Sequence, residues 1–266
     1  MNKDSIGNTF FIATTLCLIC SAVVALAAVG LKPFQDFNKA LDKKKNILVI
    51  AGLFEKGKTD VNQVFASLID DRVIDLDSGD DVTSEYAGKQ SDFDAEANLN
   101  EDSDGSDVDP KRDIAVLKRR EHRSHVYVVK KSETDATPRM YIFPIRGKGL
   151  WSTLRGFFAI DPDIKTVRGI TYYEHAETPG LGGEVDNPDW KKKWPGKIAF
   201  DDAGKVIIRV TKNVSTNSDI DALSGSTITS NGVTNMLRFW LGPDGFGPYL
   251  NRIQPGSSTQ TVTNQK

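Results

Sequence analysis

The sequence predicts an α+β protein in which a single N-terminal transmembrane helix precedes a compact domain. The first observation is an uncharged, apolar run from Phe10 to Leu31. The second is the pattern after Ile114, where short segments rich in β-branched and aromatic residues alternate with glycine and other turn residues. The third is an amphipathic helical pattern that closes this region. Strands and helices are therefore both expected in the folded part of the chain.

The composition excludes several kinds of partner and site. The 266 residues carry a formal net charge of -2, which argues against a nucleic-acid partner because phosphate binding needs a concentrated basic face. Both cysteines, Cys17 and Cys20, fall inside the apolar run. The folded part therefore has no cysteines for a disulfide framework or a metal site. The three histidines are too scattered to suggest a metal site, and we predict none.

The apolar run is long enough to cross a membrane. A helix over residues 10–31 spans roughly 30 Å at about 1.5 Å per residue, which matches the hydrocarbon core of a bilayer. A cleaved signal peptide is the alternative, with Ala25-Leu26-Ala27 as its cleavage site. However, the run exceeds a typical signal core, and Lys3 is the only basic residue before it. We expect a retained single-pass anchor with residues 1–9 in the cytoplasm.

The next segment, residues 32–76, has a helical pattern and would lie close to the membrane. A first helix is expected from Lys32 to Leu53. A second is expected to begin with Asp60 as its N-cap and to carry Val64, Phe65, Leu68 and Ile69.

Residues 77–113 form an acidic insert that we expect to be flexible. From Asp77 to Asp109, Lys89 is the only basic residue, and such a composition buries too little apolar surface to offset chain entropy. An acidic Ca²⁺ loop is the alternative, because acidic side chains alternate between Asp102 and Asp107. The terminal glutamate of the twelve-residue pattern is missing, however. Residues 255–266 are expected to be a disordered tail.

Residues 114–254 are predicted to form the compact domain. Its closing helix would bury one face and end at Gly242 and Pro243. That face comprises Val233, Met236, Leu237, Trp240 and Leu241. The expected strands are 126–129, 140–145, 157–160, 167–173 and 206–210.

Small hydroxylated residues surround a glycine directly before this last helix, from Asp221 to Ser230. Such a run can bind an anion, because glycine lets the backbone approach, hydroxyls donate hydrogen bonds and the helix N-terminus favours negative charge. Simple helix capping by serine or threonine is the alternative from the residues alone. Two more glycine-containing segments accompany this run, Gly147–Trp151 and Glu177–Glu184. Either could be an ordinary sharp turn.

The run before the last helix resembles the flavinylation motif of the FMN-binding domain family, Asp-x-x-Ser-Gly-Ala-Thr followed one residue later by Thr or Ser. The resemblance implies an FMN bound covalently, through its phosphate, to Thr227. Ser226 stands where alanine is usual and is a competing hydroxyl. The other matching positions are Asp221, Ser224, Gly225 and Thr229.

The two glycine-containing segments resemble further motifs of the same family. Its Glu-Thr-Pro-Gly-Leu-Gly loop approaches the flavin, which makes Thr178, Gly180, Leu181 and Gly182 candidate cofactor contacts. Glu177 is either a further contact or a residue that orients the loop. Similarly, Trp151 either stacks near the flavin or packs in the core. Trp190, Trp194 and Trp240 are assigned to packing.

The resemblance is most specific for the C subunits of sodium-translocating NADH:quinone oxidoreductases. It covers most of the chain, including Phe239–Gly242 and the Gly245–Pro248 segment that follows. It implies electron transfer from NADH towards quinone coupled to sodium export, with the other subunits as partners. It also implies a flavin transferase that installs FMN from FAD, so that Thr227 is a modification site and no residue is catalytic.

The same resemblance implies a bacterial inner-membrane protein with its main domain in the periplasm. The lysines after the anchor, Lys32, Lys39 and Lys43 to Lys45, oppose this orientation under the positive-inside rule. Two other functions are considered. One is the flavin subunit of an Rnf-type electron-transport complex, which shares both motifs. The other is an unflavinylated, membrane-tethered binding module.

Overall fold

The computed structural model describes residues 6–97, 99 and 104–254. The chain divides into two units at Lys43 and Lys44, and each is described by itself. The expected tail at 255–266 lies outside the described residues, as do residues 1–5 of the N-terminal segment.

The first unit contains most of helix α1 (Ile6–Ile50), a continuous helix of 45 residues. Its apolar part is long enough to cross a membrane, and none of the side chains there is buried. The helix continues through Pro33. The expected transmembrane segment and the expected helix after it therefore form one element. Cys17 and Cys20 are exposed free thiols in this helix.

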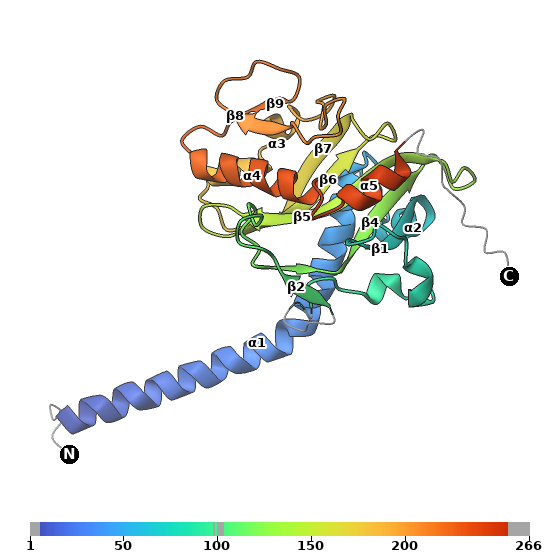
Figure 1. Ribbon diagram of the computed structural model, residues 1–266. Coiled ribbons are helices and arrows are strands. Elements are labelled where there is room, and N and C mark those ends of the chain that lie inside the picture. The colour runs from blue at the N-terminus through green and yellow to red at the C-terminus, as the bar shows by residue number, and fades with distance from the viewer. Residues whose placement is uncertain (1–5, 98, 100–103, 255–266) are drawn as a thin grey trace. The chain divides into compact units, whose positions relative to one another are not determined.

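The second unit is built on a five-stranded antiparallel sheet in the order β1-β4-β5-β6-β7 (Figure 1). Four consecutive strands form a meander, and β1 joins its edge beside β4. The expected strands at 126–129, 140–145, 157–160 and 167–173 all lie in this meander. The strands are β1 (Ile69–Asp75), β4 (Arg123–Lys130), β5 (Pro138–Lys148), β6 (Thr153–Ile160) and β7 (Val167–Glu174).

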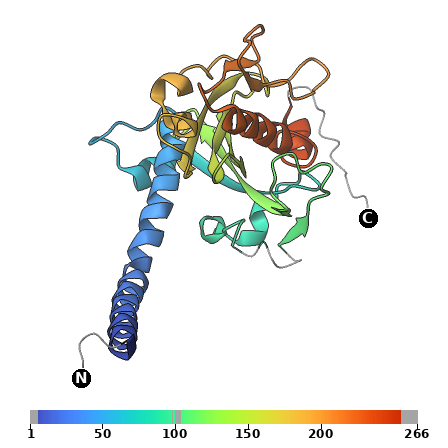
Figure 2. The same ribbon diagram turned by 90° about the vertical axis from the view of Figure 1, so that its left-hand side faces the viewer.

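Side chains alternate across the strands and so supply two cores, one on each face of the sheet. On one face, Phe143 and Ile145 pack with α4 (Thr227–Trp240) and α5 (Gly247–Ile253). Both views show α4 running along β5 (Figures 1 and 2). On the other face, Ile142 packs with Phe65 of α2 (Val61–Leu68) and with Ile47. The α+β expectation is confirmed.

Shorter elements complete the unit. Strand β2 (Gly105–Asp107) pairs with β3 (Arg119–Glu121), and β8 (Arg209–Thr211) runs parallel to β9 (Asp219–Asp221). The remaining helices are α3 (Pro188–Lys191) and the 3-10 helices η1 (Thr83–Tyr86), η2 (Gln90–Asp92) and η3 (Gly182–Asp186).

The expected helical segment at 32–76 is wrong in its last part. Helix α2 begins as predicted, because the Asp60 carboxylate accepts a hydrogen bond from the Gln63 N–H. Ile69, however, starts strand β1, which is paired with β4 from Ile69↔Val129 to Asp75↔Arg123. The spacing of Val64, Phe65, Leu68 and Ile69 fits a helix, but sheet pairing with a distant strand decides the outcome for Ile69. The sheet therefore includes residues before 114, the predicted start of the domain.

The described part of the acidic insert includes short regular elements and contacts with the sheet. It contains η1, η2 and β2. Glu96 forms a salt bridge of 3.0 Å with Arg155 on β6, and the Phe93 carbonyl lies 2.9 Å from His125 Nε2 on β4. Contacts with the sheet thus compensate for its polar composition. Within the described residues no group of acidic, histidine or cysteine side chains is arranged to hold a metal ion. Asp102 of the considered Ca²⁺ loop lies outside them.

The last predicted strand is also corrected. Only Arg209–Thr211 forms a strand, whereas Val206 makes an isolated bridge to Phe200. The closing helix agrees with the prediction: α4 buries Val233, Met236 and Leu237, and Gly242 lies just beyond its end. Buried Trp190, Trp194 and Trp240 are confirmed as packing residues.

Candidate functional site

The hydroxyl-rich run forms the turn from β9 into α4. Gly225 adopts a positive φ of 71°, a conformation that side-chain-bearing residues rarely take. The Ser226 N–H donates to the Leu223 carbonyl at 3.1 Å, and the Leu223 N–H donates to Ser230 Oγ at 3.1 Å. These bonds hold the turn so that Thr227 is the first residue of the helix.

Exposure distinguishes the hydroxyls at the start of α4. Thr227 and Ser224 are exposed, whereas Ser226 retains 6% of its accessible surface and Thr229 none. The first turn of a helix also leaves backbone N–H groups without helical partners and carries the positive end of the helix dipole. Thr227 therefore offers an accessible hydroxyl where an anion is favoured.

Glu177 joins all three motifs. Its Oε1 accepts hydrogen bonds from the Trp151 N–H at 3.0 Å and from the Ser152 N–H at 3.1 Å. Its Oε2 accepts from the Leu150 N–H at 3.1 Å and from the Thr229 hydroxyl at 2.7 Å. One carboxylate in the second motif thus ties the Gly147–Trp151 turn to the helix that carries Thr227.

The hydrogen bonds determine the charge of this group. Burial alone would raise the pKa of Glu177, but the bond from the Thr229 hydroxyl outweighs it, together with the bonds from the backbone N–H groups of residues 150–152. The pKa is held below its ordinary value, so the carboxylate is ionised at neutral pH. An ionised acceptor strengthens each of these hydrogen bonds.

Two glycines make room for the carboxylate. A Cβ at Gly149 would lie 2.6 Å from Glu177 Oε1, and a Cβ at Gly182 would lie 2.6 Å from Oε2 and 2.7 Å from Thr229 Oγ1. A third glycine, Gly232 on α4, brings the helix against the Lys148 carbonyl, where a Cβ would collide with backbone. Gly149 and Gly182 are therefore needed for close packing around Glu177, and Gly232 for close packing of α4 against the turn.

The three segments that meet at Glu177 also carry exposed apolar side chains. Trp151 keeps 68% of its surface accessible, so the core-packing alternative for this tryptophan is wrong. Leu150, Leu181 and Ile228 are exposed as well, and they come from the turn, the loop and the helix respectively. Leu181 also lies against Gly225, since a Cβ there would be 3.0 Å from Leu181 Cδ2. Thr178 and Gly180 belong to the same loop, where Gly180 is exposed and has a positive φ of 76°.

Supporting residues lie around this cluster. The Asp221 carboxylate, expected as part of the motif, binds Lys193 at 2.7 Å, and its carbonyl accepts from Trp190 Nε1 at 2.8 Å. Sequence reasoning missed the supporting roles of Ser152 and Ser230. Ser152 Oγ accepts from the Ala176 N–H at 2.8 Å and donates to Glu177 at 3.3 Å. Ser152 directly follows the Gly147–Trp151 segment, and Ser230 ends the hydroxyl-rich run. These positions are their only sequence signal.

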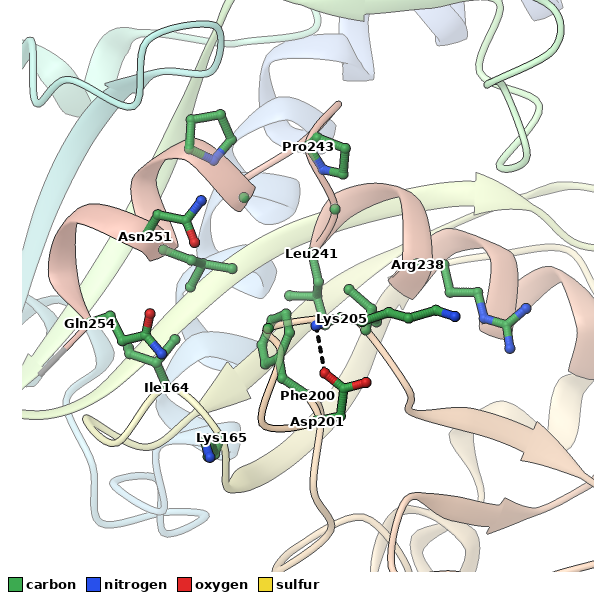
Figure 3. A pocket seen from close by; sticks show the side chains of 16 residues that line it. Ile164, Lys165, Phe200, Asp201, Lys205, Arg238, Leu241, Pro243, Asn251 and Gln254 are labelled. Atoms are coloured by element: carbon green, nitrogen blue, oxygen red, sulfur yellow. Dashed lines mark hydrogen bonds between the residues drawn. The ribbon is translucent and has the colours of Figure 1, made fainter. Parts of the chain in front are cut away.

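A cavity of about 540 Å³ lies at the other end of α4 (Figure 3). It is lined by residues of 164–165, 200–206 and 238–254, so none of the predicted site residues contributes to it. Thr227 and the exposed side chains of the three motifs lie outside this cavity.

The fold and this cluster define a protein of the FMN-binding domain class, and residues 149–242 match that domain family. The match spans the site from Gly149 through Thr229. Solved structures agree. Shewanella oneidensis NqrC is 32% identical with a TM-score of 0.74, covering 82% of this chain and 98% of that one. The C subunit of the Na(+)-translocating NADH-quinone reductase from Parabacteroides distasonis is 27% identical with a TM-score of 0.62, covering 83% and 96%.

Relatives of nearly equal length narrow the class. The C subunit of the Na(+)-translocating NADH-quinone reductase from Yersinia pestis is 45% identical over 261 residues, which cover 96% of each chain. The corresponding protein of Pasteurella multocida is 42% identical over 259 residues, or 96% of this chain and 97% of that protein. The chain belongs to the family of Na(+)-translocating NADH-quinone reductase C subunits. These relatives are C subunits of the Na(+)-translocating NADH-quinone reductase and not flavin subunits of an Rnf-type complex.

Proposed function

We propose that the chain carries FMN as a phosphoester on Thr227 and relays electrons from NADH towards quinone within a sodium-exporting complex. The observation that carries the proposal is the exposed Thr227 on the first turn of α4, in the element that Glu177 ties to the 150–152 turn and that the glycine loop contacts through Leu181 and Gly225. Its family relatives are named as subunits of the Na(+)-translocating NADH-quinone reductase, which supports the other subunits as its partners.

The residues present fit FMN. Free N–H groups at the helix start and the exposed Ser224 hydroxyl suit a phosphate. A flavin ring is flat and partly apolar, and it needs a glycine-lined approach beside apolar walls. Gly180, beside which a Cβ would meet nothing within 4 Å, would supply that approach, whereas the expected contact Gly182 is buried against Glu177. Trp151, Leu181 and Ile228 would supply the walls. Covalent attachment explains how so open a site retains its cofactor.

Ser226 is the less suitable hydroxyl. It is buried at the N-cap position of α4, whereas Thr227 is exposed. An enzyme that modifies the chain has to reach the oxygen, and burial of Ser226 prevents this. Exposure therefore supports Thr227 over its neighbour.

Thr227 needs an external enzyme for this modification. A threonine hydroxyl is a weak nucleophile without a nearby base. Glu177 is a poor candidate for that base, because its pKa is lowered and its oxygens already accept from Thr229 and the 150–152 turn. A flavin transferase would use FAD: the Thr227 Oγ–P bond forms, the bond between the two FAD phosphates breaks, AMP leaves, and the hydroxyl proton passes to the transferase.

When bound, FMN supplies reversible electron-transfer chemistry. The chain's own part is positional. Glu177 fixes the 150–152 turn relative to α4, and the glycines around it keep the loop close to the helix. No residue of the chain is assigned a bond-making role.

The proposed location is the bacterial inner membrane, with the domain in the periplasm. A transferase working outside the cytoplasm requires this orientation, although the lysines from Lys32 to Lys45 favour the opposite one. Alkaline phosphatase fused to the C-terminus should be active in whole cells. Activity of a cytoplasmic reporter at the same position would overturn the orientation and, with it, periplasmic flavinylation.

A denaturing gel tests the attachment. Protein made together with its transferase should give a fluorescent band that survives denaturation, that is absent in Thr227→Ala and that persists in Ser226→Ala. Mass spectrometry of the Asp221–Arg238 peptide should find the mass of one FMN ester on it. Fluorescence lost only in Ser226→Ala would move the attachment to Ser226. An unmodified peptide from the native host would support the unflavinylated binding module instead.

A further inference from the structure

The cavity at the C-terminal end of α4 includes none of the proposed flavin contacts, although part of its lining lies in the family-like segments Phe239–Gly242 and Gly245–Pro248. Its volume of about 540 Å³ falls within the range typical of small-molecule sites, about 300–1,000 Å³. Three segments enclose it: the turn after β6, the 200–206 turn, and the end of α4 together with α5. All of them lie in the second unit.

The floor of the cavity is apolar. Phe200, Leu241 and Leu250 contribute buried side chains to it, and Ile164 closes the side next to the turn. Ile164 adopts a positive φ of 56°, which is an outlier for a β-branched residue. Its N–H donates to the Asp161 carbonyl at 3.0 Å, which holds the turn in this conformation. Strained residues of this kind concentrate at ligand sites.

The charges at the rim are unbalanced. Lys205 and Arg238 line the cavity, and no described residue forms an ion pair with either of them. The carboxylate of Asp201, also in the lining, accepts from the Lys205 and Ala203 N–H groups of its own turn. The third cation, Lys165, is bound by Asp202 at 2.9 Å. Lys205 and Arg238 therefore line the same hollow without an ion-pair partner among the described residues, and the lining carries three cations but only one carboxylate, that of Asp201.

The polar groups are separated by the apolar floor. In Figure 3, Lys205 and Arg238 lie towards the right, Asn251 and Gln254 lie on the left, and Leu241 and Phe200 lie between them. Lys205 extends towards the side on which Arg238 lies. Asn251 and Gln254 add carboxamides, which can donate or accept hydrogen bonds.

We infer that this cavity binds a small amphiphilic anion, a carboxylate or phosphate attached to an apolar body. The anionic group would lie at Lys205 and Arg238, and the body would cover Phe200 and Leu241. Arg238 alone has another explanation, since it lies in the last turn of α4, where the helix dipole favours a cation. The dipole accounts neither for Lys205 nor for the apolar hollow beside the two charges. The inference does not depend on the flavin.

Three water-soluble probes of matched shape test the inference: 2-naphthoate, the neutral 2-naphthamide and the cationic 2-naphthylmethylammonium. Binding to the full chain in lipid nanodiscs is measured by equilibrium dialysis, with empty nanodiscs as the blank. Naphthoate should bind at least about tenfold more tightly than naphthamide, because a charge-assisted hydrogen bond is roughly twice as strong as a neutral one. The cation should bind more weakly still.

Matched variants locate the site. Lys205→Gln with Arg238→Gln should abolish the preference for naphthoate over naphthamide. Lys89→Gln with Lys212→Gln removes the same two charges from exposed positions outside the cavity and should retain the preference. An unchanged thermal midpoint verifies that each variant is folded. Equal binding of the three probes, no binding above the blank, or an equal loss in both double variants would overturn the inference. Displacement of naphthoate by inorganic phosphate or by acetate would place the anionic group at Lys205 and Arg238.

Discussion

The Thr229 hydroxyl donates a 2.7 Å hydrogen bond to Glu177 Oε2, although the two residues are 52 positions apart in the chain. Both side chains are buried, and the same carboxylate also accepts from the N–H groups of Leu150, Trp151 and Ser152. The start of α4, the glycine loop and the 150–152 turn therefore share one charged group. We therefore expect a substitution of Thr229 or Glu177 to perturb all three segments.

Removing the Thr229 hydroxyl should destabilise the fold. Thr229→Val leaves a buried carboxylate one donor short, which costs about 1–3 kcal/mol of unfolding free energy. Thr229→Ser retains the hydroxyl and should lose less. Urea unfolding measures both variants. No loss in Thr229→Val, which keeps the γ-methyl group, would show that the hydrogen bond does not contribute to stability.

Glu177 should make the unfolding free energy depend on pH in the acidic range. Its pKa is lowered on folding, so its contribution is present above the pKa of the unfolded chain, about 4.3 for glutamate, and is lost as pH falls through the lower folded value. The unfolding free energy of the parent minus that of Glu177→Gln should be constant above about pH 5.5 and should shrink towards about pH 3. A difference that grows on acidification would contradict the lowered pKa.

Gly182 should tolerate no side chain. The Cβ of Gly182→Ala would lie 2.6 Å from Glu177 Oε2 and 2.7 Å from Thr229 Oγ1, so the carboxylate has to move and loses donors. We expect a loss of about 1–3 kcal/mol and a weaker fluorescent band on the denaturing gel. Gly169→Ala is the matched control on β7, since its Cβ would meet only Ile50 at 3.4 Å or more. Gly182→Ala should be clearly less stable than this control.

Trp151 should matter for the flavin and not for the fold. An exposed side chain away from the core contributes little, so Trp151→Ala should change unfolding free energy by no more than about 0.5 kcal/mol. Flavin fluorescence of the modified protein should rise, because an indole stacked on a flavin quenches its emission. Trp240→Ala removes a buried side chain and should cost about 3–5 kcal/mol. Unchanged flavin emission in Trp151→Ala would exclude stacking.

Local patterns predicted the elements that depend on nearby residues. The apolar run, the Asp60 cap of α2 and the buried face of α4 were all predictable, because their signals lie within a few turns of chain. Strand β1 was not, since Ile69 continues a helical spacing and becomes a strand only by pairing with β4. The contacts of the acidic insert likewise involve distant partners such as Arg155 and His125.

The sequence by itself determined which residues are available for the site: the hydroxyls and glycine before α4, the glycine loop, and the turn ending in Trp151. Only the tertiary structure decided that Thr227 is exposed while Ser226 is buried, and that Glu177 orients its neighbours. The physical reason is that exposure and hydrogen-bond partners arise from segments packed together across the fold. The groups that donate to the Glu177 carboxylate lie 25 to 52 residues away, beyond the reach of any local pattern.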